Sequence, residues 1–390
     1  MIKRYKIFFS VGEFSGDLLA SNLIRSLKIK TGYEFDFVGI AGPKMIEAGK
    51  IVSIFPVQDL SVTGYLEIIP KIPKILFRFI QTIKYVKQTD PDLIITVDSP
   101  GFNFFLIKVL KKFFKIRIPI VHYVAPTFWA YKPERVKECA KLFDHMFILF
   151  PFEQKFLDKV NLKYSYISNS IVADGIYNKL KKSDIKRRYN LIGNKIITIF
   201  PGSRMNELKY HLPILKKYII ALEKEYENIF FIIPTLPHLK NKILQVLNCT
   251  NILVVTNDID KSHLISASDL ILCKSGSTVL EIITKKIPLL VFYKMNKLTA
   301  YFIKRKLQIK YITICNIVMK KEVIPELIQE NFNLDNLLLK TEYLIKNKSR
   351  ISEQLKNFDI FLSKLSFRKD INIQPQEIII NYLNSNKSGT

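Results

Sequence analysis

The chain has 390 residues, 48% of them hydrophobic, and 60 Lys and Arg against 34 Asp and Glu give a formal net charge of +26. This length suits two or three domains, and the hydrophobic content is sufficient for packed cores, which excludes a disordered chain. The charge predicts an anionic partner such as nucleic acid, a membrane surface or a phosphorylated substrate. Lys, Ile and Asn are all abundant, as AT-rich coding would also produce, so the charge alone selects none of these partners.

The four cysteines are scattered and form no Cys-x-x-Cys pair, which argues against a zinc site or a disulfide framework. A reducing cytoplasm is therefore the expected location. No N-terminal signal peptide is visible, and no run reaches the roughly 18 uncharged apolar residues that a spanning helix needs. We expect no metal ion and no cofactor.

Short apolar runs alternate with longer amphipathic segments, and most of the runs are continuously hydrophobic, like strands buried on both faces of a parallel sheet. They lie at 5–11, 35–40, 93–97, 118–124 and 145–149, and again at 196–200, 230–233, 252–255, 270–273 and 289–292. This repeated pattern predicts an α/β chain of two doubly wound Rossmann-like domains facing a cleft. We expect the first domain at 1–173 and the second at 174–361, with a polar junction at 174–194.

Three segments that follow strands of the first half carry candidate cleft residues. The turn at 12–17 has Glu13, Ser15, Gly16 and Asp17, which fit either an anion or sugar site at a helix N-terminus or a plain turn with an Asp cap. Asp98 ends the strand at 93–97 and could act as a general base or as a helix N-cap.

The third segment, 122–135, contains the only Trp, Trp129, close to His122. Aromatic residues at a strand end are typical of sugar or acyl-chain contacts. A lone His more often packs structurally than acts in catalysis.

The segment 65–84 predicts a basic amphipathic helix. Ile72, Leu76, Phe79 and Ile80 fall on one face, and Phe77 lies off this stripe. The opposite face is basic, so the helix suits either a membrane surface or packing on its own core with a solvated basic face.

In the second half, two turns favour a bound phosphate. Gly202, Ser203 and Arg204 follow the strand at 196–200, where backbone N–H groups and a guanidinium can hold a diphosphate. The small-residue turn Ser275, Gly276, Ser277 and Thr278 opens a helix with Glu281 one turn inside, suited to a ribose. An ordinary capped helix explains the second turn equally well. A Gly-x-Gly-x-x-Gly motif is absent, which favours a nucleotide sugar over NAD.

Taken together, the motifs resemble those of the lipid-A-disaccharide synthase family, inverting glycosyltransferases of the GT-B type. The matching segments are 12–17, 39–45, 63–67, 91–98, 122–126 with Trp129, 150–153, 201–204, 275–281, Asn316 and 325–329. The resemblance implies transfer of 2,3-diacylglucosamine from UDP-2,3-diacylglucosamine to the 6-hydroxyl of 2,3-diacylglucosamine 1-phosphate (lipid X). It also implies that catalysis needs no metal and that the protein binds peripherally to the anionic surface of the inner membrane.

By the resemblance, Asp98 is the catalytic base, and Arg204 and Glu281 hold UDP. Asn316, Glu326 and Gln329 line the same cleft. One departure is Asn169, which stands where the family usually has His. The C-terminal segment 362–390 is expected to pack back on the first domain or on the partner in a homodimer.

Two other classes of protein fit part of this pattern. A UDP-sugar epimerase or hydrolase shares the scaffold but gives no reason for the basic amphipathic helix. A nucleic-acid-binding protein fits the charge, but no recognisable module is present and lysine is spread along the whole chain.

Overall fold

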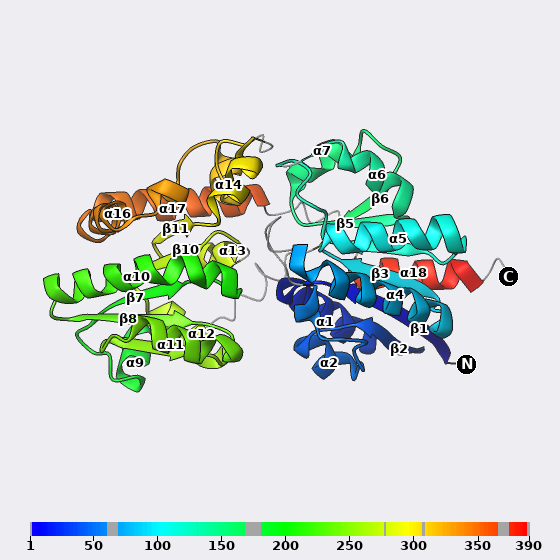
Figure 1. Cartoon of the computed structure of the whole chain (residues 1–390), viewed down its shortest axis with the longest axis horizontal. Helices are drawn as coiled ribbons and strands as arrows, with labels where there is room; N and C mark the ends of the chain where they lie inside the picture. Colours follow the sequence, from blue (N-terminus) through cyan, green and yellow to red (C-terminus); the bar gives the residue numbers. More distant parts are fainter. Residues whose placement is uncertain are drawn as a thin grey trace. The chain divides into compact units, whose positions relative to one another are not determined.

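The computed structural model describes residues 2–60, 69–130, 132–167, 181–276, 278–305, 309–365 and 374–387. They form two compact units (Figure 1). The first unit holds the described residues up to 167 together with 374–387, and the second holds 181–305 and 309–365. The predicted boundary at 173/174 lies outside the described residues.

The first unit is built on a six-stranded sheet in the order β2-β1-β3-β4-β5-β6, with every pair parallel. The strands are β1 Lys3–Val11, β2 Tyr33–Ile40, β3 Leu93–Val97, β4 Ile120–Tyr123, β5 His145–Ile148 and β6 Lys163–Tyr166. Its helices are α1 Phe14–Lys28, α2 Pro43–Gly49, α4 Ile72–Thr89, α5 Pro100–Phe114, α6 Arg135–Leu142, α7 Gln154–Leu157 and α18 Pro375–Lys387. Short 3-10 turns are η1 Val57–Asp59, η2 Ile69–Lys71 and η3 Pro151–Glu153.

The second unit repeats this plan with the parallel order β12-β11-β10-β7-β8-β9. The strands are β7 Lys195–Phe200, β8 Ile229–Pro234, β9 Ile252–Val255, β10 Leu270–Lys274, β11 Leu289–Tyr293 and β12 Glu326–Ile328. The helices are α9 Lys182–Arg188, α10 Met205–Glu225, α11 Lys240–Leu247, α12 Asp258–Ala267, α13 Thr278–Thr284, α14 Lys297–Lys304, α15 Ile314–Met319, α16 Leu334–Lys346 and α17 Lys348–Leu365. The 3-10 turns are η4 Pro237–Leu239 and η5 Gln329–Asn331.

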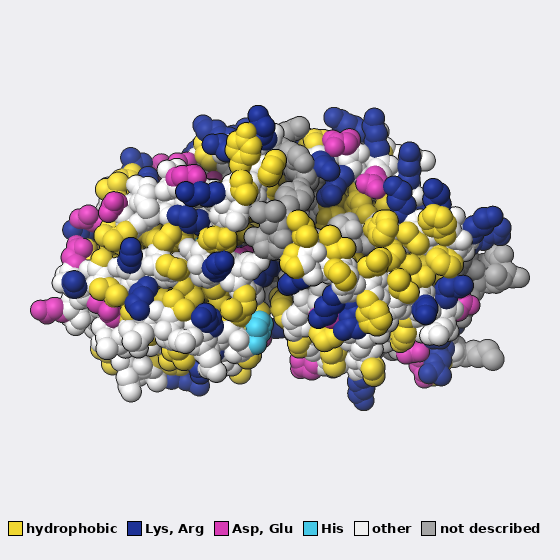
Figure 2. Space-filling view, viewed as in Figure 1, with side chains coloured by type: hydrophobic (Ala, Val, Ile, Leu, Met, Phe, Trp, Pro, Cys, Tyr) yellow, Lys and Arg dark blue, Asp and Glu magenta, His cyan; other side chains and the backbone are white. Residues whose placement is uncertain are grey.

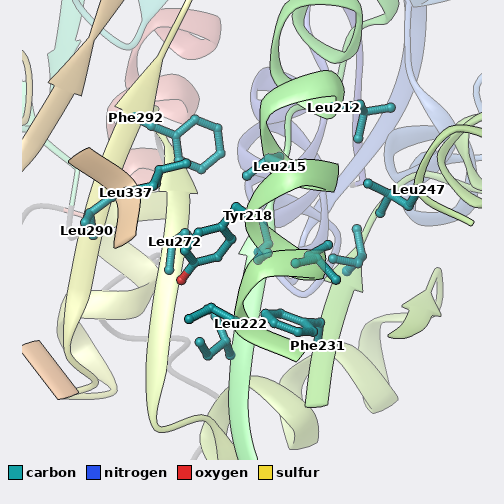
Figure 3. Close-up of a cluster of buried hydrophobic side chains, with 14 of the residues drawn as sticks. Leu212, Leu215, Tyr218, Leu222, Phe231, Leu247, Leu272, Leu290, Phe292 and Leu337 are labelled. Carbon is teal, nitrogen blue, oxygen red and sulfur yellow. The ribbon is translucent and has the colours of Figure 1, made fainter. Parts of the chain in front are cut away.

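Alternating side chains of β7 show why the strands read as continuous hydrophobic runs. Ile197 and Ile199 belong to a buried hydrophobic cluster with residues of α10, α11 and α16. Figure 3 shows part of this cluster, with Tyr218 of α10 among its side chains. Ile196, one position away, packs on the other face with residues of α9 and α12. Both faces of the strand are therefore buried, as a doubly wound parallel sheet requires.

The last described helix, α18, packs on α1 of the first unit. Asn384 accepts a hydrogen bond from the Tyr5 hydroxyl at 2.9 Å, and the Tyr382 hydroxyl donates to the Asp144 carbonyl at 3.0 Å. The described part of the C-terminal segment thus packs on the first unit of the same chain, and its packing on a partner in a homodimer stays a prediction.

Candidate active site

In the first unit, the order β2-β1-β3 makes the β1/β3 border the point where the chain reverses direction across the sheet. Ligands of open α/β sheets bind beyond the carboxyl ends of the strands at such a switch point. The turns that follow β1 and β3 meet here. A Cβ on Gly12 would lie 2.3 Å from the Ser99 Oγ, so only glycine permits this approach.

Asp98 follows β3 directly at this switch point. Asp98 and Ser99 both have a φ of 48°, a left-handed conformation that non-glycine residues adopt only when neighbouring groups hold them. Ser99 is the N-cap of α5, so the alternative of Asp98 as the helix N-cap is wrong.

The buried side chain of Asn103 holds this turn. Its Nδ2 donates to the carbonyl oxygens of Asp98 at 2.7 Å and of Val97 and Ser10 at 3.3 Å each. Its Oδ1 accepts from the Ser10 hydroxyl at 2.6 Å. One amide thus ties the ends of β1 and β3 to the backbone of Asp98.

The turn after β1 has a structural task. The buried Asp17 carboxylate accepts from the backbone N–H groups of Lys44 and Met45, both at 3.0 Å, at the N-terminus of α2. Desolvation raises the pKa of Asp17 against the effect of these bonds. Gly16 is also buried, whereas Glu13 and Ser15 are half-buried. The Asp17 carboxylate therefore holds α2 in place, and its predicted contact with a ligand stays a prediction.

His122 is also a structural residue. It lies on the central strand β4, fully buried, with its ring stacked on Phe143 at 4.6 Å and its Nδ1 2.7 Å from the Thr96 hydroxyl. Burial lowers the pKa of His122 to about 3, so the ring is neutral. The His122 side chain is enclosed within the core, and its predicted place along the cleft stays a prediction.

Trp129 is held by a residue that the sequence did not single out. Its indole Nε1 donates to Glu153 Oε1 at 3.2 Å, while Glu153 Oε2 accepts from the N–H groups of Leu149 and Phe150, both at 3.0 Å. Glu153 is buried, and this desolvation raises the pKa of its carboxyl to about 7 despite the three hydrogen bonds. The segments after β4 and β5 are joined through this carboxyl.

We expect the fluorescence of Trp129, the only Trp, to titrate with a midpoint near pH 7. Two backbone donors occupy Oε2, so a proton would sit on Oε1 and face the indole N–H, which breaks that bond. Because the folded-state pKa exceeds the usual value of 4.5, the carboxyl's contribution to stability falls as pH rises from 4.5 to about 7. A pH titration of emission tests this.

Glu153→Gln should abolish the titration, and Glu134→Gln, which changes an exposed carboxylate between Trp129 and α6, should leave it unchanged. A transition that persisted in Glu153→Gln would contradict the assignment.

In the second unit, the switch point lies between β7 and β10. Gly202, Ser203 and Arg204 follow β7, and Lys274 is the last residue of β10. The buried Glu207 of α10 joins them. Its Oε1 accepts from Arg204 Nη1 and from Lys274 Nζ, both at 3.1 Å, and its Oε2 accepts from the Ser203 N–H at 2.9 Å.

Two further features fix this turn. Gly202 has a φ of 132°, and a Cβ there would lie 2.5 Å from Glu207 Oε2, so glycine is required. His211 Nδ1 donates to the Pro201 carbonyl at 2.6 Å, and its Nε2 accepts from the Lys294 N–H at 3.0 Å. Burial lowers the pKa of His211, in keeping with this neutral form. The cations lower the pKa of Glu207 against its desolvation, so the carboxylate is charged.

The turn after β10 completes this edge of the sheet. Ser275 is half-buried and its N–H donates to the Phe292 carbonyl at 3.1 Å, while Gly276 is exposed. Thr278, half-buried, begins α13. Glu281 pairs with Lys261 at 3.4 Å. Ser277 lies outside the described residues.

The side chains of Asn316 and Glu326 hold a loop together by hydrogen bonds. The Asn316 side chain is fully buried, donates to Ile324 O at 2.7 Å and Glu326 Oε1 at 2.8 Å, and accepts from the N–H groups of Val323 and Ile324. The predicted contact between Asn316 and a nucleotide stays a prediction. Glu326 binds the N–H groups of Ile312 and Thr313, both at 2.8 Å. Gln329 is half-buried, and its Oε1 lies 3.5 Å from the Met295 N–H.

Comparison with known proteins decides the family. A family model described as lipid-A-disaccharide synthetase matches residues 7–375. The chain belongs to the lipid-A-disaccharide synthase family. The lipid-A-disaccharide synthase of Rickettsia typhi is 34% identical to it over 375 residues, which cover 94% of this chain and 95% of the relative.

Solved structures show the same fold at low sequence identity. The UDP-GlcNAc 2-epimerase of Neisseria meningitidis, bound to UDP-GlcNAc, has a TM-score of 0.62 at 14% identity, over 97% of this chain and 100% of that one. The calicheamicin glycosyltransferase CalG4 has a TM-score of 0.58 at 12% identity, over 98% and 99%. The predicted family, glycosyltransferase class and GT-B fold are thus confirmed, and the epimerases are only distant neighbours.

For this member of the lipid-A-disaccharide synthase family, the predicted membrane helix needs one correction. Ile72, Leu76 and Ile80 of α4 are 50%, 53% and 47% exposed, whereas Phe79 is only 6% exposed and stacks on Phe105 at 4.7 Å. Phe79 is therefore a core residue. Phe77, predicted to lie off the stripe, is exposed.

An apolar surface patch extends over α4 and α5 (Figure 2). We call Ile69, Ile72, Leu76, Phe77, Ile80, Phe105, Phe113 and Phe114 the α4–α5 patch; all of them are exposed. Exposed lysines of the same two helices, among them Lys84, Lys87, Lys108 and Lys112, accompany it. No described helix is long and apolar enough to span a bilayer.

Sequence analysis also missed Asn103, Glu207 and Lys274, as well as Glu153. Each lies within or a few residues from a matched motif. The residues predicted to bind ligand were instead those in the turns at the strand ends. Asn169 lies outside the described residues, so its role stays open.

Proposed function

We propose that this chain joins UDP-2,3-diacylglucosamine and lipid X into the β-1,6-linked disaccharide 1-phosphate with release of UDP. The oxygen of the acceptor 6-hydroxyl attacks the anomeric carbon, the bond from that carbon to the UDP oxygen breaks, and the hydroxyl proton passes to a base. The observation that carries the proposal is that Asp98 and Arg204 follow β3 and β7 at the switch points of their sheets.

Asp98 is the proposed base. It stands at the carboxyl end of β3, in a turn that Asn103 holds in a left-handed conformation. A carboxylate held there can accept the acceptor's proton, which is typically worth about 10²–10⁴-fold in rate.

The donor subsite is the turn around Arg204. The leaving UDP gains negative charge as its bond to the sugar breaks, and preorganised donors aimed at that charge lower the barrier. The Arg204 guanidinium is held by Glu207, so little reorganisation is needed. Glu281, which already pairs with Lys261, is the proposed ribose acceptor.

Incubation of the protein with UDP-2,3-diacylglucosamine and lipid X, followed by mass spectrometry, tests the proposal. We expect the disaccharide 1-phosphate and an equal amount of UDP. Isomerised or hydrolysed UDP-sugar formed without lipid X would instead indicate an epimerase or hydrolase.

We further propose that the protein docks peripherally on the anionic inner membrane through the α4–α5 patch. Both proposed substrates carry acyl chains and reside in that membrane. An amphipathic helix with exposed apolar residues and lysines binds such a surface by apolar burial together with attraction to anionic lipids.

A triple variant should release the protein from anionic vesicles at little cost in stability. It combines Ile72→Ser, Leu76→Ser and Ile80→Ser. Half-exposed side chains lose little burial, whereas Phe79→Ser should destabilise the fold by about 3–5 kcal/mol, as for other buried aromatic truncations. Vesicle flotation and thermal unfolding measure the two effects.

The matched control is Ile259→Ser with Leu339→Ser, which removes exposed apolar side chains from the second unit. Flotation unchanged in the triple variant, or lost equally in the control, would place the membrane contact elsewhere.

A further inference from the structure

Lys274 lies where the two phosphate-binding turns of the second unit meet. It ends β10, and β10 is paired with β7, whose own end leads into the Gly202–Arg204 turn. Its Nζ is 3.1 Å from Glu207 Oε1, the oxygen that also accepts from Arg204. An added Cβ on Gly276 would stand 3.3 Å from the same Nζ, so the ammonium group also adjoins the turn after β10.

The charges at this switch point leave a positive excess. Glu207 is shared by two cations, Arg204 and Lys274, and Glu281 pairs with a third, Lys261. One cation would neutralise the Glu207 carboxylate, and two contact it, so this pair of cations carries one positive charge that Glu207 does not balance. The Lys274 side chain is 18% exposed, so it is not fully enclosed in the core.

We propose that Lys274 is a second cation of the diphosphate-binding site and shares the phosphate charge with Arg204. This rests on the proposed function, because it takes the ligand to be the diphosphate of a UDP-sugar. A lysine ammonium has three N–H donors, and Glu207 takes one of those of Lys274. The remaining donors can contact a phosphate oxygen from the β10 side while Arg204 contacts the diphosphate from the β7 side.

Titration calorimetry with UDP, UMP and uridine tests the assignment without reference to turnover. We expect Lys274→Met to weaken UDP binding about 10- to 100-fold, the usual effect of losing a hydrogen bond to a charged group. Uridine affinity should stay unchanged, and the effect on UMP should be intermediate. Lys274→Arg, which keeps the charge, should recover most of the UDP affinity.

Lys186→Met is the matched control. Lys186 is also 18% exposed and also pairs with a carboxylate, Asp269, at 3.3 Å. Asp269 precedes β10, whereas Lys274 is its last residue. The control therefore removes the same charge near the amino-terminal end of β10 instead of at its carboxyl end. We expect wild-type UDP affinity in this variant.

Three results would each overturn the inference. Lys274→Met could lose UDP and uridine affinity equally, or lose neither. Lys186→Met could lose as much UDP affinity as Lys274→Met. If the Met variant does not fold, Lys274→Gln, which retains a donor for Glu207, serves for the same comparison. A wild-type protein that binds no UDP would instead refute the proposed donor site, so the two failures are distinguishable.

Discussion

Asp98→Asn is expected to lower kcat by about 10²–10⁴-fold, the usual worth of positioned proton transfer. The amide has nearly the same size as the carboxylate, and the Asn103 side chain donates to the backbone carbonyl of residue 98, which the substitution retains. The turn should therefore keep its shape while losing the group that accepts the proton. Steady-state kinetics with both acylated substrates measures kcat, and calorimetry should give wild-type UDP affinity.

Asp92→Asn is the matched control. Asp92 precedes β3, Asp98 follows it, and the Asp92 Oδ2 accepts from the Lys6 N–H at 2.7 Å. This variant removes a carboxylate from the other end of the same strand and should retain kcat. Asp98→Asn with more than about a tenth of the wild-type rate would be incompatible with a general base.

Arg204→Ala is expected to reduce kcat by about 10²–10³-fold, or roughly 3–4 kcal/mol of transition-state stabilisation, as for removal of an oxyanion donor. Leaving UDP gains charge in the transition state, so the loss should persist at saturating donor. Glu207 keeps its bonds to Lys274 and the Ser203 N–H, so the fold should survive. Rates at saturating donor and circular dichroism test both points.

Arg350→Ala provides the comparison. Arg350 of α17 pairs with Glu353 at 2.8 Å with the same three-residue spacing as Arg204 and Glu207, but both side chains of this pair are exposed. It should have wild-type kcat. Normal turnover of Arg204→Ala at saturating UDP-sugar would remove Arg204 from the catalytic step.

The strands show how far hydrophobic pattern reaches. The ten runs singled out from the sequence all became strands, because interior parallel strands must bury both faces. The two strands missed, β6 and β12, are edge strands of their sheets. Edge strands are covered less completely, and the sequences Lys-Tyr-Ser-Tyr and Glu-Leu-Ile carry no continuous apolar run.

Helix α4 shows the limit of periodicity. Its buried residues are Phe79, Thr82 and Val86. Because Thr82 is polar, the hydrophobic pattern did not identify the face of the helix that packs on the core. The apolar stripe predicted from the sequence only partly coincides with the face that packs on the core. Ile72, Leu76 and Ile80 are therefore exposed, whereas Phe79 is buried. Which apolar face of a helix meets the core depends on its neighbours, here Phe105 of α5.

For polar residues within the motifs, too, the structure was needed to show which side chains are buried. Asp17, His122 and Asn316 were candidates for ligand contact, yet each is buried and bonded inside the fold. A polar residue in a motif can contact the ligand, or it can hold in place the loop that contacts the ligand. The sequence does not distinguish these two roles. Burial and hydrogen-bond partners, which only the folded chain supplies, separate them.

The sequence by itself determined the α/β class, the two-fold repetition and the family, because continuous apolar runs and motif order are properties of the chain alone. Only the tertiary structure decided which strand ends meet. The orders β2-β1-β3 and β11-β10-β7 put Asp98 beside the turn after β1 and Lys274 beside Arg204. Strand order depends on how helices cross over between strands, and pairings between residues about 70 positions apart, such as Phe200 with Cys273, leave no local signal.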